Sequence, residues 1–244
     1  GGIGQAMADV LLDQYAFDHL FLAARNLEKI PLHLANSPQI TCIHFDFDQI
    51  ESIETGTQTI KDWFKNNQAD SSGLDFIVNT LGVLHTDEFQ PEKRLESLNM
   101  NQLLETYKVN AALPILCIQA LLPLCRGKNL THIVNVSAKV GSIGDNGLGG
   151  WYSYRASKSA LNMLTKTLSI ECKQRKINAC VLAIHPGTVK TNLSNPFTNQ
   201  GQKTSNKRLL EASESACAIL KVAFDQTQEQ SGTFHSWNGE PLPW

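Results

Sequence analysis

Short apolar runs rich in β-branched residues alternate along the chain with longer segments in which apolar residues recur at helical spacing. The runs are almost continuously apolar, which is typical of strands that are buried on both faces of a sheet. We expect strands at residues 18–24, 39–45, 74–79, 132–136, 178–184 and 232–237. We expect helices at residues 5–14, 50–67, 98–124, 154–173 and 211–224.

The regular alternation of strands and helices predicts a doubly wound α/β fold, in which helices flank both faces of a parallel sheet. The length of 244 residues fits one large domain or two small ones. Because no repeat, low-complexity segment or linker divides the chain, we expect residues 1–244 to form a single domain.

The composition is that of an ordinary globular protein, with 42% hydrophobic and 18% charged residues. The formal net charge of −2 argues against nucleic acid as a partner, because phosphate binding needs many clustered cations. The six cysteines are scattered without a C-x-x-C pair, which favours free buried thiols over disulfides or a metal site. The longest apolar stretch, residues 111–125, contains prolines and is too short to span a membrane. We therefore expect a soluble, cytoplasmic protein.

The chain opens with Gly1-Gly2-Ile3-Gly4, a glycine turn that enters the first expected helix without a strand before it. In a doubly wound fold the first strand is central, so its loss would leave a gap in the sheet. We expect that roughly ten residues, enough for one short strand and its turn, precede this segment in the natural chain. The alternative is that another segment of the chain fills the slot.

The glycine turn has the composition of a dinucleotide phosphate site. Gly2, Ile3 and Gly4 would let the backbone approach a pyrophosphate, and the helix that they enter offers free N–H groups. Arg25 follows the next strand, about 20 residues later, where dinucleotide folds read the adenosine ribose. A guanidinium matches a 2′-phosphate in charge and geometry, so we expect NADP(H) to be favoured over NAD(H). The alternative is that Arg25 is an ordinary exposed side chain at a strand end.

Further cofactor contacts are expected where later strands end, because open sheets bind ligands at the carboxyl ends of their strands. Asp46, followed by Phe47, could accept a hydrogen bond from the adenine amino group. Asn79, Leu81 and Gly82 close the next strand, and Gly82 would let the chain turn beneath the cofactor.

Tyr154 and Lys158 begin a long amphipathic helix and, four residues apart, project from the same face. A nearby ammonium favours the phenolate, so we expect Lys158 to lower the pKa of a tyrosine that otherwise titrates at about 10. Tyr154 could then exchange a proton with an alcohol or a carbonyl near neutral pH. A Y-x-x-x-K pair alone is weak support, because it often occurs by chance.

Several short motifs occur together in the order and spacing of one family. They are Gly2-Ile3-Gly4, Asn79-Thr80-Leu81-Gly82, Asn110, Tyr154-x-x-x-Lys158 and Pro186-Gly187-x-Val189-x-Thr191. In these motifs the chain resembles the short-chain dehydrogenase/reductase family over essentially its whole length, which implies a Rossmann fold. Residues 135–144 and 150–155 resemble in particular the branch of the sniffer carbonyl reductase and the bacterial C-factor-like proteins.

The resemblance implies a role for each motif. Tyr154 would be the catalytic acid in carbonyl reduction, and Lys158 would orient the nicotinamide ribose. Asn110 would help to hold a water that links Lys158 to solvent, and its apolar neighbours indicate that it is buried and hydrogen-bonded. The nicotinamide carboxamide would be engaged by Pro186, Gly187, Val189 and Thr191.

The catalytic serine of the family is displaced in this chain. It usually stands three residues before the glycine of the following loop, and here that position is Ala138, before Gly141. Ser137 is adjacent but, on an extended strand, points to the opposite face unless the strand end twists or bulges. We assign Ser137 as the third catalytic residue, with Ser142 or neither serine as the alternatives. If neither reaches the carbonyl oxygen, Tyr154 and bound water would carry a slower reaction.

The polar segment of residues 188–208 lies between the last cofactor motif and the next helix, and we expect it to be a substrate lid. The alternative is a disordered surface loop. The bulky side chains that could touch a small-molecule carbonyl or alcohol substrate are Leu193, Phe197, Trp151 and His85.

Three functions fit the sequence. The first is an NADP(H)-dependent oxidoreductase of the carbonyl reductase type, with Tyr154 as general acid and base. The second is an NAD(P)-binding, C-factor-like signalling protein with weak or no turnover, and the third is an interaction protein without a cofactor. The glycine turn and the Tyr154/Lys158 pair favour the first two. The apolar helices at residues 98–124 and 154–173, together with the resemblance, also indicate a homodimer or tetramer.

Overall fold

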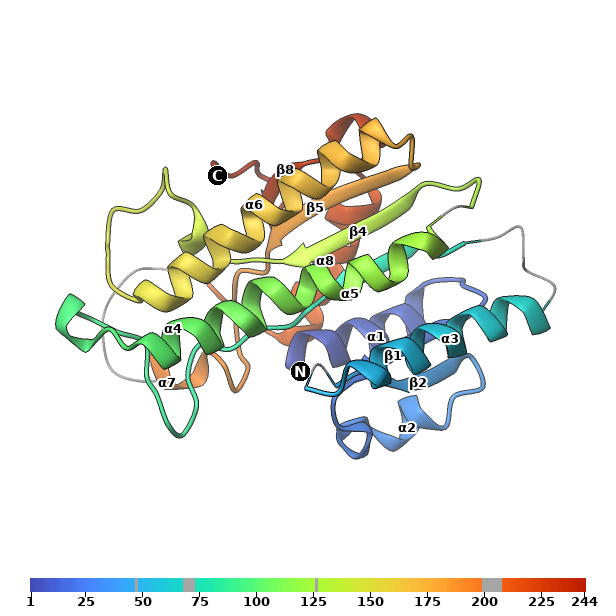
Figure 1. The fold of residues 1–244 in the computed structure, drawn as a ribbon, viewed down its shortest axis with the longest axis horizontal. Helices are drawn as coiled ribbons and strands as arrows, with labels where there is room; N and C mark the ends of the chain where they lie inside the picture. Colours follow the sequence, from blue (N-terminus) through green and yellow to red (C-terminus); the bar gives the residue numbers. More distant parts are fainter. Residues whose placement is uncertain (47, 68–72, 126, 199–207) are drawn as a thin grey trace.

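A computed structural model describes residues 1–46, 48–67, 73–125, 127–198 and 208–244, and helices cover both faces of its parallel strands (Figure 1). The strands are β1 (Leu20–Ala24), β2 (Ile40–His44), β3 (Phe76–Asn79), β4 (Thr131–Val136), β5 (Ala179–His185), β6 (Thr188–Val189), β7 (Leu209–Leu210) and β8 (Thr233–Ser236). The helices are α1 (Gly2–Gln14), α2 (Leu32–Ala35), α3 (Ile50–Asn66), α4 (Met100–Tyr107), α5 (Leu113–Leu121), α6 (Tyr152–Gln174), α7 (Asn195–Thr198) and α8 (Ala212–Phe224).

The predicted α/β fold is confirmed, and each expected strand is found close to its expected bounds. Helix α1 begins earlier than expected, at Gly2, so the glycine turn forms the first turn of the helix itself.

The strands form two main parallel groups. β3, β4, β5 and β8 make a four-stranded sheet, and β1 pairs with β2 in a separate one. Within the described part of the chain, β1 pairs only with β2, and β3 pairs only with β4. The described main strands therefore form two separate parallel sheets, and a strand before the glycine turn stays a prediction.

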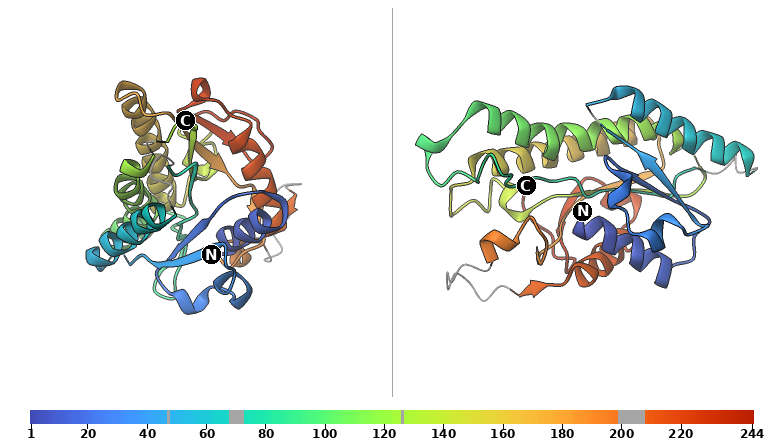
Figure 2. Two further views of the ribbon diagram at one scale, coloured as in Figure 1. Left: turned by 90° about the vertical axis from the view of Figure 1, so that its right-hand side faces the viewer. Right: turned by 90° about the horizontal axis from the view of Figure 1, so that it is seen from below.

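Alternate residues of the central strands contribute to two apolar cores on opposite faces of the sheet. One core packs α1 and α8 on β4 and β5, with Val134 and Leu182 fully buried. The other packs α5 and α6 on Ile133 and Val181 of the same two strands. Figure 2 (left) shows the strands between the two helical layers. Because both faces are covered, these strands need the almost continuous apolar runs of the sequence.

The helix expected at residues 98–124 is found as one continuous helical stretch, Met100–Leu124, in which the hydrogen-bonding pattern changes. It consists of α4, a π-helical turn at Lys108–Ala112, α5 and a 3₁₀ turn at Leu122–Leu124. Pro114 accounts for the π turn, since it has no N–H to donate to the carbonyl of residue 110 and its ring crowds that carbonyl. The π turn carries Asn110 into the interior, where it is fully buried.

By length and composition alone, Met100–Leu124 is long and apolar enough to cross a membrane. In the structure its first half packs against α6, and Ile118 and Leu122 pack on the sheet. An apolar helix that covers a sheet meets the same criterion, so this finding gives no support for membrane insertion.

Candidate active site

Tyr154 and Lys158 lie in the first two turns of α6, and both are buried. Nζ of Lys158 donates a hydrogen bond of 3.0 Å to the carbonyl oxygen of Val136 at the end of β4. The same Nζ lies 3.7 Å from where a Cβ atom on Gly82, after β3, would stand. The ammonium is thereby held at the carboxyl edge of the sheet, where open α/β sheets bind ligands.

Burial controls the protonation of both groups. It raises the pKa of Tyr154 to about 12, and it lowers the pKa of Lys158 to about 8. The expectation that Lys158 lowers the pKa of Tyr154 is therefore wrong for this structure, because burial disfavours the charged phenolate. At neutral pH Tyr154 is a neutral phenol, which is the form that can donate a proton.

Asn110 connects the π turn to the helix of the tyrosine. Its side chain accepts a hydrogen bond from N of Val83 at 2.7 Å and donates one to the Val83 carbonyl oxygen at 2.9 Å. Nδ2 also donates to Oγ of Ser157 at 3.0 Å, and Ser157 donates to the carbonyl oxygen of Tyr154 at 2.8 Å. The predicted burial and hydrogen bonding of Asn110 are confirmed, and its part in a water relay stays a prediction.

The loop after β4 packs against α6 at Lys158. A Cβ atom on Gly141 would lie 2.7 Å from Cβ of Lys158 and 2.8 Å from its carbonyl carbon, closer than real side chains approach. From the same helix, Ser159 donates a hydrogen bond of 2.6 Å to the carbonyl oxygen of Gly141. Glycine is therefore required for the loop to reach the helix.

The structure does not bring Ser137 to Tyr154. Oγ of Ser137 is buried and donates a hydrogen bond of 2.6 Å to Oδ1 of Asn162, further along α6. Ala138 instead packs in the apolar cluster that contains Tyr154. Ser142 is directed toward the C-terminal residue, whose carbonyl oxygen lies 3.3 Å from its Oγ. The alternation of side chains along an extended strand accounts for the different directions of Ser137 and Ala138.

Apolar and aromatic side chains surround Tyr154. They are Leu84, Ala138, Val140, Trp151, Leu193 and Phe197. The ring centroid of Trp151 lies 6.2 Å from that of Tyr154 and 5.4 Å from that of Phe197. His85 adds a further ring, 5.6 Å from Phe197. The four bulky candidates from the sequence therefore converge on one site from three separate segments.

Helix α7 carries Phe197 to this cluster and belongs to the segment expected to be a lid. Residues 199–207 of the same segment lie outside the described residues. The lid function therefore stays a prediction.

The glycine turn forms a cradle at the start of α1. A Cβ atom on Gly4 would lie 2.6 Å from Oγ1 of Thr80, and one on Gly2 would lie 2.9 Å from Cγ2 of Thr191. Ile3 packs toward the core of α1 and α8. Because the first N–H groups of a helix have no partner within it, an anion can bind there without displacing a hydrogen bond. These residues therefore fit the phosphates of a dinucleotide.

Arg25 follows β1 and is exposed, as a side chain that binds a cofactor phosphate must be. The pKa of Asp48 is lowered mainly by its hydrogen bond to Lys108, at 2.5 Å, and to a smaller extent by the charge of Arg25. The positive charges of Arg25 and Lys108 thus both lie near the Asp48 carboxylate. Asp46 accepts a hydrogen bond from N of Asp48 at 3.1 Å and shapes the turn after β2. Phe47 lies outside the described residues.

Asn79 is buried at the end of β3, where its Nδ2 donates to the carbonyl oxygen of Pro114 and to Oδ1 of Asn135, both at 3.1 Å. Its side chain thus links β3 to α5 and β4. Leu81 is half-buried, and Gly82 is exposed next to Lys158. In this motif the backbone after Asn79, and not its side chain, reaches the site.

The segment after β5 carries the remaining cofactor candidates. Oγ of Ser215 on α8 donates a hydrogen bond of 2.7 Å to the carbonyl oxygen of Pro186. Gly187 has a φ of 83°, and Val189 is buried where β6 pairs with β7. Thr191 then contacts the glycine turn. The segment is therefore fixed between α8 and the cradle.

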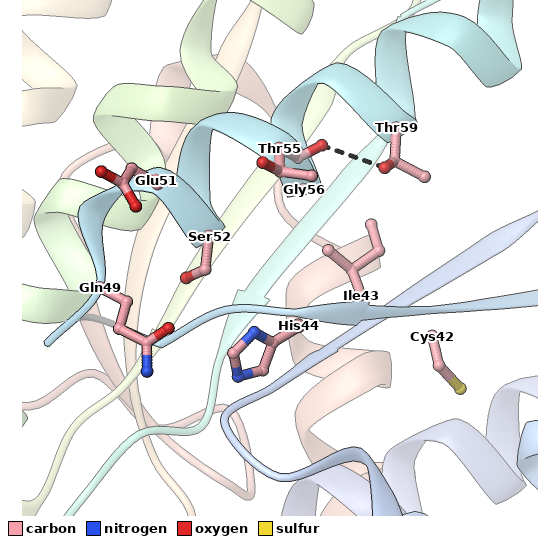
Figure 3. A pocket seen from close by; sticks show the side chains of 9 residues that line it. All are labelled: Cys42, Ile43, His44, Gln49, Glu51, Ser52, Thr55, Gly56 and Thr59. Atoms are coloured by element: carbon pink, nitrogen blue, oxygen red, sulfur yellow. Dashed lines mark hydrogen bonds between the residues drawn. The ribbon is translucent and has the colours of Figure 1, made fainter.

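A cavity of about 320 Å³ lies elsewhere, between β2 and α3 (Figure 3). Cys42, His44 and polar side chains of α3 line it, and it shares no lining residue with the cluster around Tyr154. Within its wall the Thr59 hydroxyl bonds back to the carbonyl oxygen of Thr55 at 3.0 Å. We assign this cavity no part in the reaction.

Three residues of the site are not evident from the sequence alone, namely Val83, Ser157 and Glu92. Ser157 could have been found, because a serine three residues after Tyr154 on a helix can bond back to its carbonyl. Val83 acts through its backbone, which leaves no signal in the sequence. Glu92 is a buried carboxyl group whose partners lie in a distant segment.

The sequence of the chain matches a known protein family and several of its members. The sequence profile of the family described as short chain dehydrogenase matches residues 1–202. C-signal of Myxococcus xanthus is 30% identical over 171 residues, which cover 70% of this chain and 93% of that protein. A 1-hydroxy-2-glutathionyl-2-methyl-3-butene dehydrogenase of Rhodococcus sp. (strain AD45) is 32% identical over 171 residues, 70% of this chain and 69% of that protein.

Solved structures share the fold. The carbonyl reductase Sniffer of D. melanogaster has a TM-score of 0.82 and 27% identity, over 100% of this chain and 95% of that chain. An NADPH-bound carbonyl reductase from chicken fatty liver has a TM-score of 0.81 and 26% identity, with the same coverage. A family profile that spans most of the sequence, and a fold that matches these reductases throughout, lead to one conclusion: the chain belongs to the short chain dehydrogenase family.

Proposed function

We propose that the protein is an NADP(H)-dependent oxidoreductase that transfers hydride between the nicotinamide and a carbonyl or alcohol substrate. The observation that carries the proposal is the burial of Tyr154 and Lys158 together, one helical turn apart, beside Gly82 and an aromatic cluster. Burying an ammonium costs free energy, so a buried lysine beside a tyrosine at a ligand-binding sheet edge points to chemistry.

A nicotinamide cofactor, when bound, supplies the hydride. In the reductive direction Tyr154 donates its phenolic proton to the carbonyl oxygen, and the ammonium of Lys158 stabilises the phenolate that remains. With a pKa of about 8, Lys158 can pass a proton to the phenolate and recover one from solvent. Asn110 holds the first turns of α6 in place through Ser157. The aromatic cluster excludes water from the reacting groups.

The residues that would hold the cofactor lie along the carboxyl edge of the strands. The first turn of α1 would bind the pyrophosphate, Lys158 the nicotinamide ribose, and the backbone of residues 186–191 the carboxamide. Arg25 would pair with a 2′-phosphate, which favours NADP(H) over NAD(H). The NADPH in the similar chicken reductase supports the same choice.

A second function is supported by one specific observation. Ala138 stands beside Tyr154 where a serine hydroxyl would assist the reaction. In addition, C-signal is a relative that the chain matches over 93% of its length. The alternative is therefore a cofactor-binding signalling protein with weak turnover.

A panel of small and medium-sized carbonyl compounds, assayed by NADPH oxidation, separates the two functions. The carbonyl reductase predicts turnover of at least one compound, with loss of that turnover in Tyr154→Phe. NADPH binding in a fluorescence titration without turnover across the panel would favour the signalling protein. Neither binding nor turnover would contradict both proposals.

We also propose that the protein is a cytoplasmic homo-oligomer. All six cysteines are free, in keeping with a reducing compartment. Helices α4, α5 and α6 expose large apolar side chains, which are Met100, Leu104, Leu116, Met163 and Ile170. A second copy of the chain would remove this surface from water. Light scattering of the purified protein should give the mass of a dimer or tetramer, and a monomer at micromolar concentration would contradict the proposal.

A further inference from the structure

Glu92 is a buried carboxyl residue that the proposed reaction does not use. It lies in the loop between β3 and α4, with 2% of its surface exposed. A buried carboxyl group costs free energy unless protein hydrogen bonds replace those of water. The hydrogen bonds of Glu92 therefore indicate its role.

These hydrogen bonds go to the start of α6. Oε2 of Glu92 accepts from N of Ser153 at 3.3 Å, and Oε1 accepts from the Ser153 hydroxyl. The carbonyl oxygen of Glu92 accepts from N of Trp151, the residue before the helix. Helix α6 has no capping side chain at Trp151 and no acidic residue in its first turn. Glu92 supplies both from another segment, next to N–H groups that the helix leaves unpaired.

Trp151 needs this support because its backbone lies in the left-handed region, at φ 52° and ψ 45°. This conformation is unfavourable for a bulky residue and persists only where the surroundings fix it. Arg155 holds the other side of the turn, since its Nε donates to the carbonyl oxygens of Gly149 at 3.1 Å and Gly150 at 3.0 Å. The turn before the tyrosine is thus held between Glu92 and Arg155.

The loop that carries Glu92 is itself anchored. Gln102 of α4 is buried, and its Nε2 donates a hydrogen bond of 2.9 Å to the carbonyl oxygen of Gln90. Pro91, which is also buried, restricts the backbone immediately before Glu92. These contacts therefore hold the loop, and Glu92 with it, in a fixed position beside the start of α6.

Tyr154 follows Ser153 directly, and its ring lies edge-on to that of Trp151, 6.2 Å between centroids. Any movement of the first turn of α6 would displace the tyrosine hydroxyl, and a shift of about 1 Å can cost about 100-fold in rate. We infer that Glu92 is a positioning residue that fixes the first turn of α6 and so aims the Tyr154 hydroxyl at the substrate. The inference rests on the proposed function, in which Tyr154 is the proton donor.

The test compares Glu92→Ala and Glu92→Gln with Glu96→Ala, a control in which an exposed carboxyl is removed from the same stretch. Alanine removes both side-chain hydrogen bonds to Ser153. Glutamine keeps them, because its oxygen can accept from the Ser153 N–H while its amide donates to the hydroxyl. The two variants therefore separate the loss of the hydrogen bonds from the loss of the carboxyl group.

We expect kcat for carbonyl reduction to fall by about 100-fold in Glu92→Ala and to be largely restored in Glu92→Gln. The Kd for NADPH should not change. The isotope effect from NADPH deuterated at the transferred position should rise in Glu92→Ala, because the chemical step becomes rate-limiting. A merely structural role would reduce the amount of folded enzyme without changing kcat per folded site or the isotope effect.

Amide hydrogen exchange over residues 151–155 gives a readout that does not need activity. Exchange at Ser153 should accelerate in Glu92→Ala and stay unchanged in Glu96→Ala. A kcat and isotope effect in Glu92→Ala equal to those of the unmodified protein would overturn the inference, as would unchanged exchange at Ser153. If the unmodified protein reduces no carbonyl, the proposed function fails instead, and exchange still decides whether Glu92 fixes this turn.

Discussion

The hydroxyl of Ser137 donates a hydrogen bond of 2.6 Å to Oδ1 of Asn162, eight residues after Tyr154 on α6. Ala138, the next residue, packs beside the tyrosine in its place. The side of the site from which a serine would reach the substrate oxygen is therefore apolar. Tyr154 acts in this account without a second side-chain hydroxyl.

The substitution Ala138→Ser places a hydroxyl beside Tyr154, and we expect it to raise kcat for carbonyl reduction by about 10-fold or more. Ser137→Ala should change kcat by less than about 3-fold, because that hydroxyl is engaged in its hydrogen bond to Asn162. It should lower the free energy of unfolding by about 1–2 kcal/mol, since Asn162 loses its partner. Steady-state kinetics and urea denaturation measure both effects. A loss of kcat of about 100-fold or more in Ser137→Ala would show that Ser137 takes part in the reaction, because the loss of one oxyanion-stabilising donor has an effect of that size.

Arg25→Ala should weaken NADPH binding by about 10-fold or more, because a 2′-phosphate loses its charge-assisted partner. Binding of NADH should change little, and the unmodified protein should bind NADPH at least several-fold more tightly than NADH. Fluorescence titration of each cofactor gives these affinities, and Arg94→Ala serves as the exposed arginine control. Equal affinities of the unmodified protein for the two cofactors would refute the preference.

Lys158→Met should make the folded protein more stable while abolishing turnover. Burial lowers the pKa of Lys158 from 10.5 to about 8, so the ammonium destabilises the folded state below pH 8. That cost is relieved as the pH rises from 8 toward 10.5, because the unfolded chain then holds more protons. We expect a gain of about 1–3 kcal/mol at pH 7 that shrinks between pH 8 and 10. Urea denaturation at several pH values measures it, and a loss of stability at pH 7 would be inconsistent with this account.

Gly141→Ala should lower the free energy of unfolding by about 2 kcal/mol and reduce kcat, because its Cβ would meet the backbone of α6 at Lys158. Gly147→Ala is the matched control, since no atom lies within 4 Å of a Cβ there. Thermal denaturation of both variants makes the comparison. Equal stabilities would mean that the loop can move away from the helix at no cost.

The fold follows from the sequence because strands covered on both faces must be apolar throughout, and helices between them must be amphipathic. The pair Tyr154 and Lys158 is visible for the same reason, since helical spacing places both on one face. Strand alternation also explains why Ser137 turns away from the tyrosine that Ala138 faces. These features can be predicted because local patterns in the sequence determine them.

Other parts depend on contacts between distant segments. Glu92 and Ser153 are 61 residues apart. The sequence around either residue therefore does not indicate that the Glu92 carboxyl group caps the helix that contains Ser153. The raised pKa of Tyr154 likewise comes from burial by residues of several loops, among them Leu84 and Phe197. A sequence pattern cannot report how much water such a cluster excludes.

The turnover of Tyr154→Phe tests the central claim most directly. Phenylalanine keeps the ring and its packing against Trp151, and removes only the hydroxyl that would carry the proton. With a carbonyl that the unmodified protein reduces, kcat should fall by about 100-fold or more, while the Kd for NADPH changes by less than about 2-fold. Undiminished turnover in this variant would show that Tyr154 is not the proton donor.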